Sequence, residues 1–257
     1  MVKPIVIANW KMNKNAAESR EWLSVLKEDL KGVEPKKIDV VACPPFTVLT
    51  EMSRAVAPLI LGAQNLHWED RGTFTGEISG GMLREAGCQY VIVGHSERRW
   101  KMGETDEMIH RKLQAAWRHQ LTPILCIGEQ AKDKAENKTE RVLHDQLCFA
   151  LSGFTRNQIA SLVVAYEPVW AIGTGAIGSR PPATPADVRS AYAIIKQCLG
   201  QHNLTARLVY GGSVDAKNAA EFFSLSDNQG FLVGGASLKP LEFGSVVKQT
   251  LKHYVGN

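Results

Sequence analysis

The 257-residue sequence contains no segment that approaches about 18 consecutive apolar residues, the length a membrane-spanning helix needs. Its N-terminus lacks the apolar stretch of a signal peptide. Lys and Arg are scattered, the net charge is only +4, and no basic run interleaves with aromatic residues as a nucleic-acid surface would require. We therefore expect a cytoplasmic protein with no membrane or nucleic-acid partner.

The cysteines form no CxxC pair, are odd in number and do not stand at zinc-ligand spacing with histidine. A disulfide framework and a metal site are both unexpected, and buried thiols in a reducing compartment are the simpler interpretation. The five positions are Cys43, Cys88, Cys126, Cys148 and Cys198.

Apolar residues make up 44% of the chain and charged residues 22%, as in an average water-soluble globular protein. The sequence contains no low-complexity stretch and no linker-like shift in composition. This length suits one large α/β barrel, so we expect a single domain over residues 1–257.

Short β-branched apolar runs recur eight times, and strands that are apolar on both faces belong in a buried parallel sheet. The predicted strands are Ile5–Ala8, Ile38–Ala42, Leu59–Ala63, Tyr90–Val93, Pro123–Ile127, Leu162–Ala165, Arg207–Tyr210 and Phe231–Val233.

Segments with apolar residues at three- and four-residue spacing lie between these runs and predict helices. They are Ala17–Leu30, Thr105–His119, Glu140–Leu151, Ala186–Leu199 and Leu241–His253. Eight alternating units predict a closed (β/α)8 barrel of eight parallel strands, whereas six or seven would favour an open doubly wound sheet.

In such a barrel the active site lies at the C-terminal ends of the strands, so the polar residue or glycine after each apolar run is a candidate. Glu167 is the candidate base, since a carboxylate at the barrel mouth can abstract a proton next to a carbonyl. His95 precedes a probable helix start, whose dipole favours a neutral imidazole able to polarise a carbonyl. Taken alone, each is more commonly a solvated or structural residue. The strand-end candidates are Asn9, Lys11, Asn65, His95, Glu97, Glu167, Ser213, Gly234 and Gly235.

Lys11 could be an ordinary surface lysine, but after the first strand it would place a positive charge where an anion binds. Two glycine pairs, Gly211-Gly212 before Ser213 and Gly234-Gly235, follow consecutive strands. Glycines there let backbone N–H groups approach a phosphate closely, which matches the usual phosphate site of these barrels.

Seven motifs, in this order, make the chain resemble the triosephosphate isomerase family along essentially its whole length. They are Ala8-Asn-Trp-Lys-Met-Asn13, Gln64-Asn65, Thr75-Gly-Glu77, Val93-Gly-His-Ser-Glu-Arg-Arg99, Ala165-Tyr-Glu-Pro-Val-Trp170, Tyr210-Gly-Gly-Ser213 and Val233-Gly-Gly-Ala-Ser-Leu238. The resemblance implies an isomerase of glycolysis and gluconeogenesis that interconverts dihydroxyacetone phosphate and glyceraldehyde 3-phosphate through an enediolate.

The resemblance also implies the roles of the candidates. Glu167 is expected to be the base and a neutral His95 the electrophile, which is this enzyme's established pairing. Lys11 and Asn9 are expected to bind substrate and stabilise the enediolate, and Glu97 to support the site. The phosphate is expected at Gly173, Ser213, Gly234 and Gly235. No cofactor is implied, and the family resemblance implies a homodimer.

The segment from Ala171 to Ala183 is rich in Gly and Pro and predicts a long loop after the sixth strand. By resemblance, the loop from Pro168 onward is a lid over the substrate. Family members join the lid to Ala-Thr-Pro through Lys and one more residue, whereas Ala176–Pro182 fill that place here. We expect a longer C-terminal hinge that bulges away from the substrate.

Two alternatives share the phosphate loops. Another barrel enzyme acting on a sugar phosphate, such as a different isomerase or an aldolase, is one of them. A Schiff-base aldolase would need a reactive lysine on a central strand, and none of the predicted central strands offers one. The second alternative is a non-catalytic binding barrel, which would be expected to have lost Lys11, His95 or Glu167.

Overall fold

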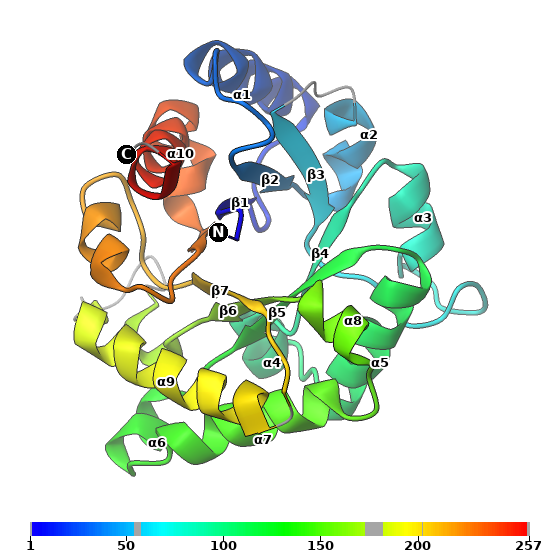
Figure 1. The fold of residues 1–257 in the computed structure, drawn as a ribbon. Coiled ribbons are helices and arrows are strands. Elements are labelled where there is room, and N and C mark those ends of the chain that lie inside the picture. The colour runs from blue at the N-terminus through cyan, green and yellow to red at the C-terminus, as the bar shows by residue number, and fades with distance from the viewer. Residues whose placement is uncertain (1, 54–57, 173–181, 202, 256–257) are drawn as a thin grey trace.

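The computed structural model describes residues 2–53, 58–172, 182–201 and 203–255. Its strands form one closed parallel barrel in which each strand pairs with the next along the chain and β8 pairs with β1 (Figure 1). This confirms the predicted architecture, with strand ends within one residue of those expected. The strands are β1 (Ile5–Asn9), β2 (Asp39–Cys43), β3 (Leu59–Ala63), β4 (Tyr90–Val93), β5 (Thr122–Ile127), β6 (Val163–Tyr166), β7 (Arg207–Tyr210) and β8 (Gly230–Val233).

Helices surround the barrel (Figure 1). The longer ones match the predicted amphipathic segments, and several short helices had no such signal. The α-helices are α1 (Ala16–Asp29), α2 (Leu49–Met52), α3 (Gly80–Glu85), α4 (Ser96–Lys101), α5 (Asp106–Arg118), α6 (Ala131–Ala135), α7 (Thr139–Leu151), α8 (Arg156–Ala160), α9 (Pro185–Gln201) and α10 (Pro240–Val255). The 3-10 helices are η1 (Phe46–Val48), η2 (Val169–Ala171), η3 (Ala219–Ser224) and η4 (Gly235–Leu238).

Local capping explains where the main helices begin. Asn15 precedes α1, and its side chain accepts a hydrogen bond from the Glu18 amide while the Glu18 carboxylate accepts one from the Asn15 amide. Thr184 and Asp187 make the same reciprocal pair at the start of α9, where Pro185 occupies the first helical position. Such boxes satisfy the backbone N–H groups that a helix start leaves without partners.

Two apolar layers follow from the period-two alternation of strand side chains. Ile5 and Ile7 of β1 pack inside the barrel, together with alternate residues of the other strands. Val6 and Ala8 point outward and pack in the layer between the barrel and the helices. Because both faces are buried, the strands can be apolar on both sides, as the sequence indicated.

A polar cluster occupies the N-terminal end of the barrel interior. The Asp39 carboxylate pairs with Arg207 at 2.7 Å and with Lys3 at 2.5 Å, and it accepts a hydrogen bond from the Tyr90 hydroxyl. Burial raises the pKa of Asp39, but the hydrogen bonds and charges of Lys3 and Arg207 outweigh burial and hold it below its usual value. The cluster joins the starts of β2, β4 and β7 far from the opposite mouth.

Candidate active site

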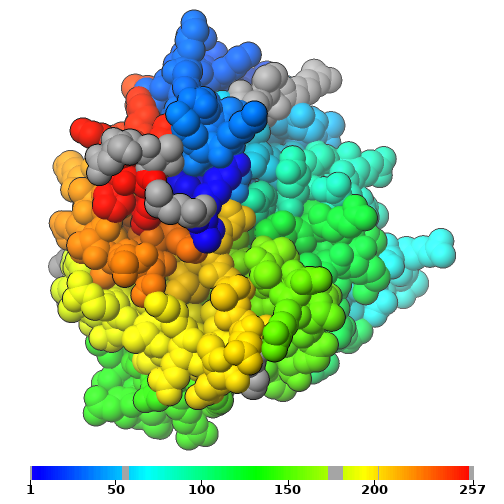
Figure 2. Space-filling view, viewed as in Figure 1, coloured from blue at the N-terminus to red at the C-terminus, as the bar shows by residue number. Residues whose placement is uncertain are grey.

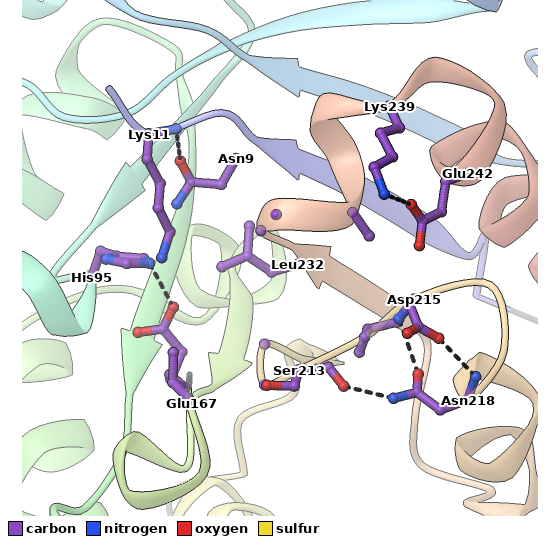
Figure 3. Close-up of a pocket in the computed structure, with 17 residues that line it drawn as sticks. Asn9, Lys11, His95, Glu167, Ser213, Asp215, Asn218, Leu232, Lys239 and Glu242 are labelled. Atoms are coloured by element: carbon purple, nitrogen blue, oxygen red, sulfur yellow. Dashed lines mark hydrogen bonds and ion pairs between the residues drawn. The ribbon is translucent and has the colours of Figure 1, made fainter. Parts of the chain in front are cut away.

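A pocket of about 310 Å³ opens at the C-terminal ends of the strands (Figure 3). It contains most of the residues that the sequence singled out, joined by loop residues of the two last strands. Its lining consists of Asn9, Lys11, His95, Glu167, Ile172, Gly211, Gly212, Ser213, Val214, Asp215, Asn218, Leu232, Gly234, Gly235, Ala236, Lys239 and Glu242.

Strand alternation explains why Asn9 and Glu167 face this pocket. Ile5 and Ile7 point into the barrel, so Asn9, the next residue in that register, emerges at the mouth. Val163 and Ala165 point inward on β6, and Glu167 continues their register beyond the strand end. Both side chains therefore line the pocket.

Glu167 is held between two partners on the loop after β4. Its Oε2 atom accepts a hydrogen bond of 2.8 Å from the backbone N–H of Ser96. Its Oε1 atom lies 3.1 Å from Nε2 of His95, although the two groups are not aligned as a hydrogen bond and Oε1 has no other partner among the described residues. The side chain is only 2% exposed, so a buried carboxylate lies directly against the imidazole.

Close backbone packing fixes the Glu167 side chain from the other side. A Cβ atom on Gly211 would lie 3.0 Å from Cγ of Glu167, and one on Gly128 would lie 1.7 Å from the Glu167 carbonyl oxygen. The Gly128 contact requires glycine, and a side chain on Gly211 would displace the Glu167 side chain by a few tenths of an ångström. Nearby, burial and then the negative charge of Glu167 raise the pKa of the Cys126 thiol well above its usual value.

His95 caps the start of α4, and its ring tautomer follows from that position. Nδ1 accepts a hydrogen bond of 3.2 Å from the backbone N–H of Glu97, so this nitrogen carries no proton. Nδ1 also lies 3.7 Å from the Glu97 carboxylate, but it could donate to that group only if it carried the proton; the shorter contact, with the N–H donor, makes Nδ1 an acceptor. With Nδ1 as an acceptor, the ring proton lies on Nε2, which faces the pocket.

Lys11 reaches the same region from the loop after β1. Its Nζ atom pairs with Oε1 of Glu97 at 2.9 Å, and its backbone N–H donates to Oδ1 of Asn9. Partial burial raises the pKa of Glu97, but the hydrogen bond and charge of Lys11 outweigh this and lower it. Lys11 adopts a φ of 53°, in the left-handed region that non-glycine residues seldom occupy, and Gln64 holds its carbonyl with a hydrogen bond of 2.8 Å. Such strain is commonly found at functional sites.

The opposite wall consists of the loops after β7 and β8. Among the described residues, the backbone N–H groups of Ser213, Gly234 and Gly235 have no hydrogen-bond acceptor, although these residues line the pocket. The Ser213 hydroxyl donates to the carbonyl of Ala171 at 3.2 Å. These amides supply free donors for an anion.

Two predicted site residues, Glu97 and Asn65, do not line the pocket. Glu97 contacts the pocket through its ion pair with Lys11. Gly173 and most of the predicted longer hinge, Ala176–Pro182, lie outside the described residues. Asn65, a strand-end candidate, is buried against Lys112 rather than in the pocket.

Sequence reasoning missed Glu129, which is the second residue after β5, as Glu167 is the first after β6. Its buried carboxylate accepts hydrogen bonds from Tyr166 and from Nε1 of Trp170, the latter at 2.7 Å. Burial raises the pKa of Glu129, and the hydrogen bonds only partly offset this. Lys134 lies 3.3 Å from the Trp170 ring centroid. The apolar run before Glu129 is the sequence signal that could have identified this residue as a strand-end candidate.

A (β/α)8 barrel with a buried carboxylate, an imidazole and a lysine at its mouth is a barrel enzyme equipped for proton transfer. The described residues include no group of three or more His, Cys, Asp or Glu side chains placed to hold a metal ion. In the same part of the chain, no helix has the length and apolarity needed to cross a membrane.

Comparison with known proteins identifies the enzyme more closely. The family profile described as triosephosphate isomerase matches residues 4–250. The chain is 47% identical to the triosephosphate isomerase of Synechococcus sp. strain JA-3-3Ab over 96% of this chain and 95% of that protein. It is 44% identical to the enzyme of Moorella thermoacetica, over 96% and 98% of the two chains. The crystal structure of triosephosphate isomerase from Bartonella henselae superposes with a TM-score of 0.82 at 36% identity, over 96% and 98% of the two chains.

The chain therefore belongs to the triosephosphate isomerase family. It catalyses the interconversion of dihydroxyacetone phosphate and glyceraldehyde 3-phosphate, a step of glycolysis and gluconeogenesis. The expectations of an isomerase, of the triose phosphate substrate and of the barrel fold are thus confirmed, and the two alternative functions are set aside.

Proposed function

We propose that Glu167 is the base of this isomerisation and that His95, as a neutral imidazole, is the electrophile. The observation that supports both roles is the 3.1 Å contact between Oε1 of Glu167 and Nε2 of His95 inside the pocket. It brings a proton acceptor and a proton donor together in one pocket, where a substrate that separates them could meet both groups.

The proton is accounted for at each step. The Glu167 carboxylate takes a proton from C1 of dihydroxyacetone phosphate, the C–H electron pair forms the C1=C2 double bond, and the carbonyl pair moves to O2. Glu167 then returns the proton to C2. The hydroxyl proton moves from O1 to O2, and we assign this relay to Nε2 of His95, the imidazole nitrogen nearest Glu167 in the pocket (Figure 3).

Substrate binding requires Glu167 to move. A gap of 3.1 Å between Oε1 and Nε2 leaves no room for a carbon atom between the two groups. The carboxylate must therefore separate from the imidazole, and a movement that breaks its 2.8 Å hydrogen bond from Ser96 would make room for C1 and C2. The structure thus corresponds to a state before substrate binding.

Lys11 and Asn9 are proposed to bind substrate and stabilise the enediolate oxygen. Their position supports this, since both line the pocket beside His95 and the Asn9 side chain fixes the Lys11 amide. Glu97 is proposed to hold the Lys11 ammonium in place through their 2.9 Å ion pair. The phosphate is proposed to bind the free amides of Ser213, Gly234 and Gly235, with Gly173 as a further donor carried over from the family resemblance.

Glu167→Gln tests the base directly because glutamine keeps the shape but cannot take up the proton. In heavy water we expect the variant to lose both isomerisation and exchange of the C1 hydrogen of dihydroxyacetone phosphate, by at least about 10²-fold. Proton NMR measures both rates. The control is Glu140→Gln, at an exposed position of α7. Exchange within a few-fold of the parent would rule out Glu167 as the base.

A homodimer is the proposed assembly, with the segment Gln64–Glu77 reaching into the partner and Thr75 lying near the partner's Asn9 and Lys11. This segment, between β3 and α3, projects from the barrel as the cyan protrusion in Figure 2. Large apolar side chains are exposed here: Phe74, within the segment, at 41%, and Met12, which follows the Lys11 carbonyl that Gln64 binds, at 96%. Burial in a partner would remove them from water.

Analytical ultracentrifugation at micromolar concentration tests this assembly. We expect a dimer in the parent, and a fully active monomer would refute the proposal.

We also propose that the chain forms a single domain over residues 1–257 and that it is cytoplasmic. All five cysteines are free, which suits a reducing compartment.

A further inference from the structure

The loop after β7 contains a hydrogen-bonded unit that the isomerisation does not explain. Asn218 accepts a hydrogen bond from the backbone N–H of Asp215 at 3.0 Å, and the Asp215 carboxylate accepts one from the N–H of Asn218 at 3.0 Å. Asp215 also accepts from the N–H of Lys217 at 2.7 Å. The Nδ2 group of Asn218 donates a hydrogen bond of 2.9 Å to the carbonyl oxygen of Ser213 (Figure 3).

From this geometry we infer that Asn218 is a positioning residue for the substrate phosphate. It would act by fixing the Ser213 backbone, and the inference rests on the proposed phosphate site at Ser213. Ser213 is held at two points, by Asn218 at its carbonyl and by Ala171 at its hydroxyl. Its backbone N–H, which has no acceptor among the described residues, is thereby kept available at the pocket wall.

The sequence before Ser213 explains why such a restraint is needed. Gly211 and Gly212 are the most freely rotating residues that a chain can contain. A side chain at Gly211 would push against the Glu167 side chain. A segment with this freedom loses conformational entropy when it orders around an anion, and a restraint already present in the free enzyme reduces that cost. Asn218 supplies the restraint from outside the flexible segment.

The same hydrogen-bonded unit partly offsets the charge of a carboxylate that would otherwise oppose phosphate binding. The Asp215 carboxylate lines the pocket, where its charge would repel a phosphate dianion. It accepts hydrogen bonds from two backbone N–H groups, which offset part of that charge. Asn218 is neutral, so it can reach Ser213 without adding a further carboxylate to a pocket that Asp215 and Glu242 already line.

Asn218→Ala and Asn218→Asp test the inference. Alanine removes the donor to Ser213, and aspartate keeps the shape and the acceptor for Asp215 but replaces the donor by a charged oxygen. Asn157→Ala and Asn157→Asp are matched controls at an exposed position of α8. Three readouts are needed: inhibition by inorganic phosphate, kcat and KM for the triose phosphate, and kcat/KM for glyceraldehyde, which has no phosphate.

For Asn218→Ala we expect the inhibition constant of inorganic phosphate and the KM to rise about three- to tenfold, the net effect of one hydrogen bond. The change in kcat should be smaller, and kcat/KM for glyceraldehyde should stay within about twofold. Asn218→Asp should weaken phosphate binding more strongly than Asn218→Ala. An unchanged inhibition constant of inorganic phosphate in both variants, or an equal loss of kcat/KM for the triose phosphate and for glyceraldehyde, would overturn the inference.

The parent enzyme separates this inference from the phosphate site on which it rests. Titrating the parent with inorganic phosphate should shift the amide NMR signals of Ser213 and Gly235. If those signals do not shift, the proposed phosphate site is wrong. If they shift but Asn218→Asp, which retains the shape of the side chain, binds phosphate as the parent does, only the role of Asn218 is wrong.

Discussion

The Nδ1 atom of His95 accepts a hydrogen bond of 3.2 Å from the backbone N–H of Glu97, two residues further along the chain. The contact determines the tautomer because a ring nitrogen that accepts this bond cannot also carry a proton. The ring's only proton is then on Nε2, the atom next to Glu167.

We predict that His95 stays neutral, with its proton on Nε2, throughout the working pH range. A nitrogen NMR titration of the imidazole measures this directly, with the exposed His144 as an internal reference in the same spectrum. Imidazolium shifts for His95 at neutral pH would contradict the proposed electrophile. Proton placement on Nδ1 would contradict the hydrogen-bond assignment.

Gly211→Ala is predicted to lower kcat while leaving the fold intact. The new Cβ would lie 3.0 Å from Cγ of Glu167, so the side chain of the proposed base has to shift by a few tenths of an ångström. Misplacing a catalytic group by about 1 Å can cost about 10²-fold, so we expect a loss of roughly tenfold.

Steady-state kinetics and thermal unfolding check this prediction together. Gly200→Ala is the matched control, because a Cβ at that helical position meets nothing within 4 Å. If Gly211→Ala turned over as fast as Gly200→Ala, the packing of Gly211 against Glu167 would have no bearing on the reaction.

Asp39→Asn is predicted to destabilise the barrel in a pH-dependent way. Lys3 and Arg207 lower the pKa of Asp39 in the folded chain despite its burial, so its ionisation stabilises the fold above the unfolded pKa of about 4. This contribution is lost as the pH falls through the lower folded pKa. Removing the charge leaves Arg207 partly buried beside a neutral amide, which costs about 3 kcal/mol at neutral pH.

Urea unfolding at neutral pH and at about pH 3 measures the effect. The difference in unfolding free energy between the parent and Asp39→Asn should be large at neutral pH and smaller in acid. Asp145→Asn, at a position where the side chain is 62% exposed, is the control and should change little. An equal difference at both pH values would contradict the assigned cause.

Strand periodicity accounts for what the sequence could predict about the site. The alternation that buries Ile5 and Ile7 carries Asn9 into the mouth, and the same rule on β6 carries Glu167 there. These positions depend only on a strand and its end. Short motifs supplied the roles, because they match a family whose chemistry is established.

Strand periodicity could not predict contacts that depend on how separate segments pack in the fold. Lys11 and Glu97 are 86 residues apart, and their ion pair depends on the loops of β1 and β4 meeting at the mouth. The link from Asn218 to Ser213 is local, but an asparagine in a loop has many alternative partners. The crossover from β7 to β8 contains the 3-10 helix η3, which carries no amphipathic signal long enough to predict.

Glu167→Asp tests the central claim, that the Glu167 carboxylate transfers the proton. Shortening the side chain by one methylene draws the carboxylate back by roughly 1 Å without removing its charge, a displacement that can cost about 10²-fold. The loss should fall on kcat, with KM and the binding of inorganic phosphate little changed, because the phosphate contacts are elsewhere in the pocket. The decisive measurement is the kcat of Glu167→Asp in a coupled assay for glyceraldehyde 3-phosphate. We predict a decrease of about 10²-fold, and a kcat within twofold of the parent would show that Glu167 is not the base.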